Sequence, residues 1–215
     1  MEKKEIIGLV ERTKIVAIIR GMEPEICLKL AQAYLDGGIR LVEVTFNQVG
    51  DPQKTFEAIK AIKTRFGTQL SVGAGTVITE AQLDLAIAAG AEFMVTPSTN
   101  PALIRKANAA GLVTLPGAMT PTEVVTAHEA GADFVKIFPV RALGPSYIKD
   151  VLAPLKHVKL LAVGGVSPDN AADYLKAGCV GVGASGSLVN KEWIAAGEWD
   201  KIAAEAKRFV ANLSL

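Results

Sequence analysis

The sequence predicts an α/β protein folded as a single-domain (β/α)8 TIM barrel, and three observations predict this fold class. Eight short β-rich runs alternate with amphipathic stretches, most of the runs are apolar at every position, and proline or glycine separates the two kinds of segment. Strands that are apolar throughout are typical of parallel sheets buried on both faces. Eight such units in 215 residues make a compact barrel, because this fold usually takes about 250 residues.

The eight predicted strands are rich in branched and aromatic residues. They are Ile15–Ile19, Leu41–Phe46, Leu70–Gly73, Phe93–Thr96, Leu112–Leu115, Phe134–Phe138, Val158–Val163 and Val180–Val182. The stretches between them, such as Glu25–Leu35 and Ala81–Ala89, repeat apolar residues at helical spacing. No linker or change of composition divides the chain, so we expect residues 1–215 to form one domain. An open, doubly wound sheet is the alternative, but it usually has fewer strands and its nucleotide-binding fingerprint is absent here.

Proline and glycine mark the expected ends of the helices. Proline is favoured at the first helical position because its missing N–H would have no partner there. Six prolines stand where a helix should begin, namely Pro24, Pro52, Pro101, Pro121, Pro145 and Pro168. Thr79 with Gln82, and Thr120 with Glu123, have the spacing of a capping box. Glycine follows a small residue where several helices should end, as at Gly38, Gly90, Gly111, Gly131 and Gly178.

Composition and charge exclude several classes of partner. Lys plus Arg is 23 and Asp plus Glu is 22, so the net charge is +1, and a near-neutral chain has no field suited to nucleic acid or an anionic membrane. No run of about 18 apolar residues could span a bilayer. Two histidines and two distant cysteines, Cys27 and Cys179, provide few ligands for a transition metal. We therefore expect no metal site, and a reducing, cytoplasmic compartment.

Two charged residues interrupt the most apolar predicted strands. Glu43 lies in the second strand and Lys136 in the sixth. Burial lowers the pKa of a lysine and raises the pKa of a glutamate. A lysine that is partly neutral attacks a carbonyl carbon to form a Schiff base, and a carboxyl group beside it moves protons. Catalysis by this pair is the main hypothesis. A structural ion pair is one alternative, and two side chains that leave the strand ends for solvent are another.

Further candidates stand at the carboxyl ends of predicted strands, where barrels place their active sites. Arg20 ends the first strand, and its guanidinium group suits a carboxylate or a phosphate. Thr76 and the glycines of Gly73–Gly75 close the third strand, where N–H groups and a hydroxyl can meet an anion. Gly164-Gly165 and Gly183–Ser187 follow the seventh and eighth strands. In barrels, the loops after these two strands commonly bind phosphate. A solvated arginine and ordinary tight turns are the alternatives.

Four stretches of the chain, in this order, resemble the 2-keto-3-deoxy-6-phosphogluconate (KDPG) and 4-hydroxy-2-oxoglutarate (KHG) aldolase family of class I aldolases. They are Val42-Glu43-Val44-Thr45, Gly73-Ala74-Gly75-Thr76-Val77, Pro116–Glu123 and Lys136-Ile137-Phe138-Pro139. The resemblance runs from about residue 15 to residue 189, which is most of the chain.

The resemblance implies a lyase that needs no cofactor and cleaves a phosphorylated 2-keto-3-deoxy sugar acid, or KHG, to pyruvate and an aldehyde such as glyceraldehyde 3-phosphate. It implies that Lys136 forms the Schiff base and that Glu43 is the general acid and base. It also implies a homotrimer. The substrate-binding residues that it implies are Arg20 and Thr76 for the carboxylate, Pro97 and Phe138 in the pocket wall, and Gly164, Gly165, Ser185 and Gly186 around the phosphate.

Some departures from the usual family pattern point to a branch with another substrate. Asn47, Gly144-Pro145 and Ala162–Gly165 look more like the branch that acts on 2-keto-3-deoxy-6-phosphogalactonate (KDPGal). KDPGal is therefore the alternative substrate. Two other functions stay open. One is a phosphate-binding epimerase or isomerase that uses Glu43 for proton transfer and Lys136 only as a charge, and the other is a non-catalytic metabolite-binding barrel.

Overall fold

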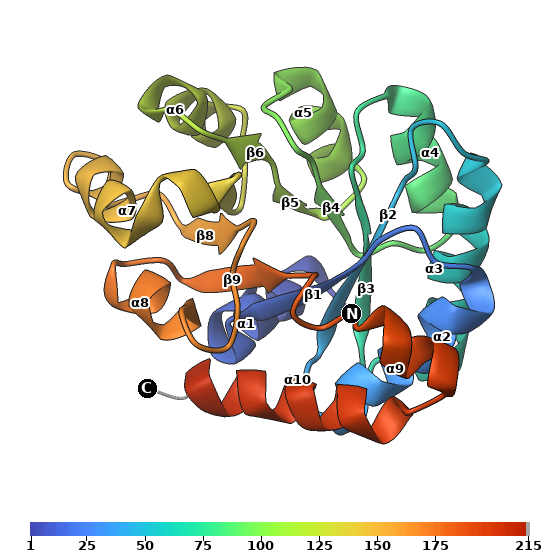
Figure 1. Cartoon of the computed structure of the whole chain (residues 1–215). Coiled ribbons are helices and arrows are strands. Elements are labelled where there is room, and N and C mark those ends of the chain that lie inside the picture. Colours follow the sequence, from blue (N-terminus) through green and yellow to red (C-terminus); the bar gives the residue numbers. More distant parts are fainter. Residues whose placement is uncertain (214–215) are drawn as a thin grey trace.

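The structure is a computed structural model of the chain and describes residues 1–213. Figure 1 shows the strands at the centre, with most of the helices arranged around them. The strands are β1 (Ile15–Ile19), β2 (Leu41–Thr45), β3 (Ser71–Gly75), β4 (Phe93–Val95), β5 (Val113–Leu115), β6 (Gly117–Ala118), β7 (Val135–Ile137), β8 (Leu160–Val163) and β9 (Gly181–Ala184).

A helix follows each barrel strand, and further helices stand at the two ends of the chain. The helices are α1 (Lys3–Thr13), α2 (Pro24–Asp36), α3 (Pro52–Phe66), α4 (Glu80–Ala88), α5 (Pro101–Ala109), α6 (Pro121–Glu129), the short 3-10 helix η1 (Val140–Ala142), α7 (Gly144–Leu152), α8 (Ala171–Lys176), α9 (Lys191–Ala196) and α10 (Trp199–Leu213). Among residues 1–213, no helix has the length and apolar character that crossing a bilayer requires.

The strands form one parallel sheet in the order β5-β4-β3-β2-β1-β9-β8-β7-β6. β5 and β6 are two halves of the fifth barrel strand, separated by Pro116, which has no N–H to donate to a neighbouring strand. The amide N of Phe134 donates to the Thr114 carbonyl at 3.1 Å, and that of Lys136 donates to the Pro116 carbonyl at 2.8 Å. These bonds join the two edges of the sheet. The predicted (β/α)8 barrel is therefore confirmed for the described residues, and Ser214 and Leu215 lie outside them.

Every predicted strand appears; seven have ends displaced by at most two residues, and the fifth, expected at Leu112–Leu115, continues through β6 to Ala118. The third strand was expected at Leu70–Gly73 but runs over Ser71–Gly75. Its glycines have a low intrinsic preference for strands, yet the sheet extends because Ala74 and Gly75 pair with Val44 and Thr45 of β2.

The expected helix starts are confirmed with one exception. Four of the prolines are the first residues of α2, α3, α5 and α6, Pro145 is the second residue of α7, and both capping boxes form. The start at Pro168 is wrong, because α8 begins at Ala171. The Asn170 side chain accepts from the Ser167 amide at 2.8 Å and donates to the Gly165 carbonyl at 3.0 Å. These bonds hold residues 167–170 in a separate turn.

Side chains along each strand point alternately into the barrel and toward the outer helices. The interior cluster contains Val16, Ile18, Leu41, Phe93, Val95, Val113, Leu115, Phe134, Leu161 and Val163. Glu43 stands two residues after Leu41, and Lys136 stands two residues after Phe134. The alternation therefore directs both charged side chains toward the inside of the barrel.

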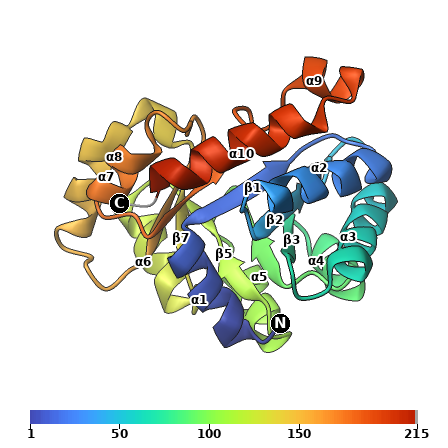
Figure 2. The ribbon, with the colours of Figure 1, turned by 90° about the horizontal axis from the view of Figure 1, so that it is seen from below.

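Helix α1 closes the amino-terminal end of the barrel, the end from which the strands start (Figure 2). Ile6 and Val10, each 1% exposed, belong to the interior cluster. Burying two aliphatic side chains of this size contributes about 1.5–3 kcal/mol each. Because one end of the barrel is filled in this way, access for a ligand is left at the carboxyl ends of the strands.

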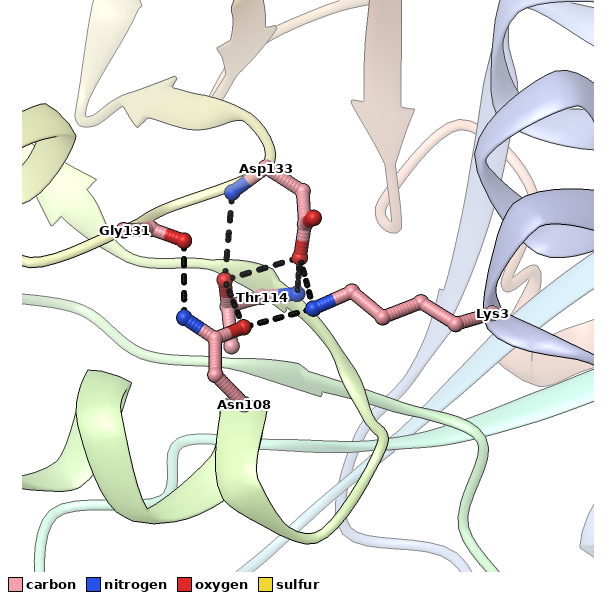
Figure 3. A network of polar contacts seen from close by, with 5 residues as sticks. All are labelled: Lys3, Asn108, Thr114, Gly131 and Asp133. Atoms are coloured by element: carbon pink, nitrogen blue, oxygen red, sulfur yellow. Dashed lines mark hydrogen bonds and ion pairs between the residues drawn. The ribbon is translucent and has the colours of Figure 1, made fainter.

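A network of polar contacts holds α1 to this end of the barrel (Figure 3). Lys3 Nζ lies 2.9 Å from an Asp133 carboxylate oxygen and 2.6 Å from Asn108 Oδ1. The same Asp133 oxygen accepts from the amide and hydroxyl of Thr114 at 2.8 and 3.1 Å. Asn108 Nδ2 donates to the Gly131 carbonyl at 2.7 Å. The network joins α1, α5, β5 and the turn before β7.

Candidate active site

Glu43 on β2 and Lys136 on β7 are both buried, at 2% and 5% exposure. Burial raises the pKa of the Glu43 carboxyl group, and the positive charges of Lys136 and Arg20 act in the opposite direction. Burial also lowers the pKa of the Lys136 amine; the Glu43 carboxylate raises it and the Arg20 guanidinium lowers it further. The barrel therefore brings three groups that are far apart in the sequence within electrostatic range of one another.

The Lys136 amine is free of hydrogen bonds and ion pairs within the described residues, and its Nζ lies 4.6 Å from the centroid of the Phe138 ring. Glu43 and Lys136 are too buried to be side chains that leave the strand ends for solvent, so this alternative is wrong. The other alternative, a contact ion pair of Lys136 with Glu43, is absent from the described residues. An uncompensated charge in such a place is costly, which favours the neutral amine.

The glycines of β3 leave room for the side chains on neighbouring strands. A Cβ atom at Gly75 would lie 1.8 Å from Oε1 of Glu43, and one at Gly73 would lie 2.2 Å from the Phe93 ring. The register of the sheet explains the first contact, because Glu43 pairs with Gly73 and the next inward position of β3 is Gly75. In the described structure, the Gly-Ala-Gly motif thus accommodates Glu43 and Phe93, whereas the sequence suggested only an approach of backbone N–H groups to a ligand.

Thr76 directly follows β3 and has a left-handed backbone, with φ of 55°. This conformation is unusual for a β-branched residue, and such strain clusters at functional sites. Its carbonyl accepts from Gln48 Nε2 at 2.9 Å. Within residues 1–213 its hydroxyl makes no hydrogen bond. Thr76 thus presents an unused donor at the carboxyl end of a barrel strand.

A cavity of about 380 Å³ opens at the carboxyl ends of β1, β7, β8 and β9. Seven of the ten predicted site residues line it, namely Arg20, Lys136, Phe138, Gly164, Gly165, Ser185 and Gly186. Glu43 lines no part of it and is coupled to it through the charge of Lys136. Thr76 and Pro97 follow β3 and β4, strands that do not contribute to the lining.

Sequence reasoning missed five residues of the cavity wall, which are Ile18, Arg141, Val163, Val166 and Ser167, whereas Gly183 and Ser187 belong to the predicted loop after the last strand. Arg141 has the largest consequence, because it adds a second arginine to Arg20 in a lining that contains no carboxylate. A site of this charge attracts anions. The signal that could have found Arg141 is the one that singled out Arg20, a cation just after the end of a barrel strand.

The loops after β8 and β9 form the remaining wall. Gly164 and Gly165 have φ of 96° and 91°, a region that glycine enters without strain. The Ser185 hydroxyl donates to the Ile18 carbonyl at 3.0 Å, and the Ser187 hydroxyl donates to the Val166 carbonyl at 3.3 Å. These two hydroxyl bonds fasten the last loop to β1 and to the loop after β8.

Metal ligands do not gather anywhere in residues 1–213, where no cluster of three or more His, Cys, Asp or Glu side chains is present. The two histidines, His128 and His157, are exposed and stand edge to face with ring centroids 4.8 Å apart. Both lie outside the cavity lining.

The family model described as KDPG and KHG aldolase matches residues 6–205. The chain belongs to this family. It is 40% identical over 175 residues to the 2-dehydro-3-deoxy-6-phosphogalactonate aldolase of Escherichia coli (strain K12), covering 81% of this chain and 83% of that one. The family and the class I aldolase activity expected from the resemblance are confirmed.

Solved structures agree with this assignment. A KDPG aldolase from Legionella pneumophila, with pyruvate captured as a covalent carbinolamine intermediate, has a TM-score of 0.83 at 27% identity, covering 94% of this chain and 96% of that one. A protein cage designed by fusing symmetric oligomeric domains has a TM-score of 0.85 at 36% identity, covering 94% of this chain and 72% of that one.

Proposed function

We propose that this aldolase cleaves KDPG to pyruvate and glyceraldehyde 3-phosphate through a Schiff base on Lys136. The observation that carries the proposal is a buried amine of lowered pKa in a cavity lined by two arginines and by no carboxylate. The substrate is a dianionic phosphate ester with a carboxylate, so this lining suits both of its ends. Glycine-rich loops after β8 and β9 supply backbone N–H groups where barrels commonly bind phosphate.

The reaction needs one nucleophile and one proton carrier. The neutral Lys136 amine attacks the C2 ketone, and Glu43 protonates the carbinolamine hydroxyl so that water leaves and an iminium forms. The Glu43 carboxylate then takes the proton of the C4 hydroxyl. The C3–C4 bond breaks, its electron pair moves into the iminium to give an enamine, and glyceraldehyde 3-phosphate leaves. Protonation at C3 and addition of water release pyruvate and restore Lys136.

The remaining residues hold the substrate. Arg20 is assigned to the carboxylate because its charge acts on both Lys136 and Glu43, and the carboxylate is bonded to the carbon that Lys136 attacks. Thr76 is assigned to the same carboxylate as Arg20. Pro97 and Phe138 are assigned to the wall of the pocket. The residues assigned to the phosphate are Gly164, Gly165, Ser185 and Gly186.

Trapping with pyruvate tests the proposal. Incubation with pyruvate and borohydride is expected to add one reduced pyruvate to Lys136, detected by mass spectrometry of peptides. Lys136→Ala is expected to lose both the adduct and the cleavage of KDPG. Lys149→Ala, which removes an exposed lysine of α7, is the matched control and keeps both. An unmodified wild-type protein would reject Lys136 as the residue that forms the Schiff base.

A second substrate, KDPGal, is favoured by the 40% identity to the phosphogalactonate enzyme of E. coli. The two sugar acids differ in configuration at C4, the carbon whose hydroxyl loses its proton in the mechanism above. Turnover of both epimers, measured side by side, decides between them. If kcat/KM for KDPGal were more than tenfold higher than kcat/KM for KDPG, KDPGal would replace KDPG as the assigned substrate.

Assembly as a homotrimer in the cytoplasm is part of the same proposal. The similarity to a chain built from symmetric oligomeric domains supports self-association. Cys27 and Cys179 are free, buried thiols whose pKa burial raises to about 12, as suits a reducing compartment. Sedimentation equilibrium tests the trimer and cell fractionation tests the location; a monomer, or a protein found outside the cytoplasm, would contradict the respective expectation.

A further inference from the structure

Arg141 is a cation of the cavity wall that neither the resemblance nor the mechanism above uses. It lies in η1, the short helix after β7, and its side chain is exposed. No hydrogen bond or ion pair engages its guanidinium group within the described residues. An arginine that lines a cavity without a carboxylate partner keeps all five N–H donors for a ligand.

The backbone around Arg141 holds it beside the loop after β8. Its amide N donates to the Gly164 carbonyl at 2.9 Å. A Cβ atom at Gly165 would lie 2.7 Å from Arg141 Nε and 2.8 Å from its Cβ. Gly165 is thus the surface on which the arginine side chain rests. Any larger residue there would displace that side chain, and the φ of 91° at Gly165 also favours glycine.

The two arginines of the cavity differ in their relation to the reactive pair. Arg20 influences the pKa of both Glu43 and Lys136, whereas Arg141 influences neither. Arg141 instead packs against Gly165 in the loop after β8, where barrels commonly bind phosphate, although both arginines line one cavity. A substrate bonded through C2 carries its carboxylate next to the amine and its phosphate four carbons away. Arg20 matches the near anion, and Arg141 matches the far one.

The geometry points to Arg141 as the side chain that binds the terminal phosphate and makes this aldolase prefer phosphorylated over unphosphorylated 2-keto-3-deoxy sugar acids. This inference rests on the proposed function. It adds a charged fork, able to hold two phosphate oxygens at once, to the backbone N–H groups and hydroxyls that the resemblance implies.

Kinetics on two substrates test the inference. A charge-assisted hydrogen bond contributes about 1.5–3 kcal/mol, which corresponds to roughly a ten- to hundredfold change. Arg141→Ala is therefore expected to lower kcat/KM for KDPG by that factor, mainly through KM. For 2-keto-3-deoxygluconate, which has no phosphate, we expect a change of less than about threefold. Arg105→Ala, an exposed arginine of α5, is the control and leaves both values unchanged.

Two further variants separate recognition of phosphate from a structural role. Arg141→Lys keeps a positive charge without the fork and is expected to recover part of the loss. Gly165→Ala is expected to reproduce the loss on KDPG by displacing the arginine. An equal loss on both substrates in Arg141→Ala, or no loss on either, would overturn the inference.

Two readouts keep this inference apart from the proposed function. The pyruvate adduct on Lys136 is expected to form in Arg141→Ala as in wild type, because pyruvate carries no phosphate. Inorganic phosphate, titrated by calorimetry, is expected to bind wild type at least tenfold more tightly than Arg141→Ala. Absence of the adduct in wild type rejects the proposed function alone, and equal phosphate affinity in the two proteins rejects the role of Arg141 alone.

Discussion

At the level of single residues, burial changes the pKa values of both Lys136 and Glu43. Burial is the largest influence on both pKa values, and it favours the neutral form of each group. A neutral amine and a carboxyl group that keeps its proton above its usual pKa are the forms that the first steps of Schiff-base chemistry need. Arg20 adds a positive charge that favours the neutral amine and opposes the neutral acid.

Removing the charge of Glu43 and removing the charge of Arg20 should displace the pH profile of Schiff-base formation in opposite directions. Only the neutral amine attacks, so the rate rises as the pH rises through the pKa of Lys136. Glu43→Gln removes a negative charge that raises this pKa, so we expect the rise at lower pH than in wild type. Arg20→Ala removes a positive charge that lowers it, so we expect the rise at higher pH.

The measurement is the rate of the borohydride-trapped pyruvate adduct as a function of pH, with each profile scaled to its own plateau. Scaling separates the position of the rise from the slower chemistry expected in Glu43→Gln. Arg105→Ala serves as the control for loss of a surface charge. Profiles of both variants that coincide with wild type would show that desolvation alone sets the pKa of Lys136, and a displacement of both in the same direction would contradict the opposite effects of the two charges.

Among the elements, β3 has two glycines that serve neighbouring strands in different ways. Gly73 faces the ring of Phe93, which belongs to the interior cluster, and Gly75 faces the carboxylate of Glu43. Sequence alone indicates only that the strand carries small residues. Which side chain fills the space above each glycine depends on the register with β2 and β4.

Alanine at each glycine of β3 should therefore give a different defect. Gly73→Ala overpacks the interior, and we expect a loss of about 1–3 kcal/mol in the free energy of unfolding with little change in kcat. Gly75→Ala forces Glu43 out of position. Because Glu43 carries the protons in the proposed mechanism, we expect kcat to fall at least tenfold where proton transfer limits the rate of turnover.

Urea unfolding and steady-state turnover of the two variants, measured in parallel, check this prediction. The variants are matched controls for each other because they make the same change two residues apart on one strand. If Gly75→Ala kept wild-type turnover, the placement of Glu43 beside β3 would have no catalytic consequence.

In the whole molecule, one end of the barrel carries the candidate active site and the other contributes to stability. The cavity and its cations lie at the carboxyl ends of the strands, and α1 with the Asp133 network fills the opposite end. Barrels separate activity and stability in this way. Substitutions at the α1 end should therefore change stability without changing the chemistry.

Asp133→Ala tests this separation. It removes the carboxylate that accepts from Thr114 and Lys3, leaving the partly buried Thr114 amide without its acceptor and the Lys3 ammonium group with Asn108 Oδ1 alone. We expect a loss of about 1–3 kcal/mol in the free energy of unfolding with kcat unchanged. Thermal or denaturant unfolding, together with turnover, measures both quantities.

The control is Glu23→Ala, which removes one partner of the exposed Lys54–Glu23 ion pair, where the side chains are 55% and 60% exposed. Pairs of this kind contribute about 0–1 kcal/mol because water and salt screen them. A loss of kcat in Asp133→Ala at temperatures where the variant is fully folded would mean that the two ends of the barrel are coupled.

Much of the fold could be predicted from the sequence because its signals are local. Apolar runs, proline at helix starts and glycine at helix ends depend on neighbours in the chain, and the barrel reproduces nearly all of them. The start at Pro168 failed because the turn is set by Asn170 bonding to Ser167 and Gly165, a contact between side chain and backbone that no apolar periodicity reports.

The sequence by itself determined the parallel barrel and the presence of Glu43 and Lys136 on its strands, because a charge within an apolar strand is visible without a structure. Tertiary structure alone decided that the charge of Arg20 acts on both groups, that Arg141 lines the same cavity as Arg20, and that Gly75 accommodates Glu43. The physical reason is that residues distant in the chain become neighbours only when the sheet closes, and the spacing between strands along a sequence does not specify which side chains then face each other.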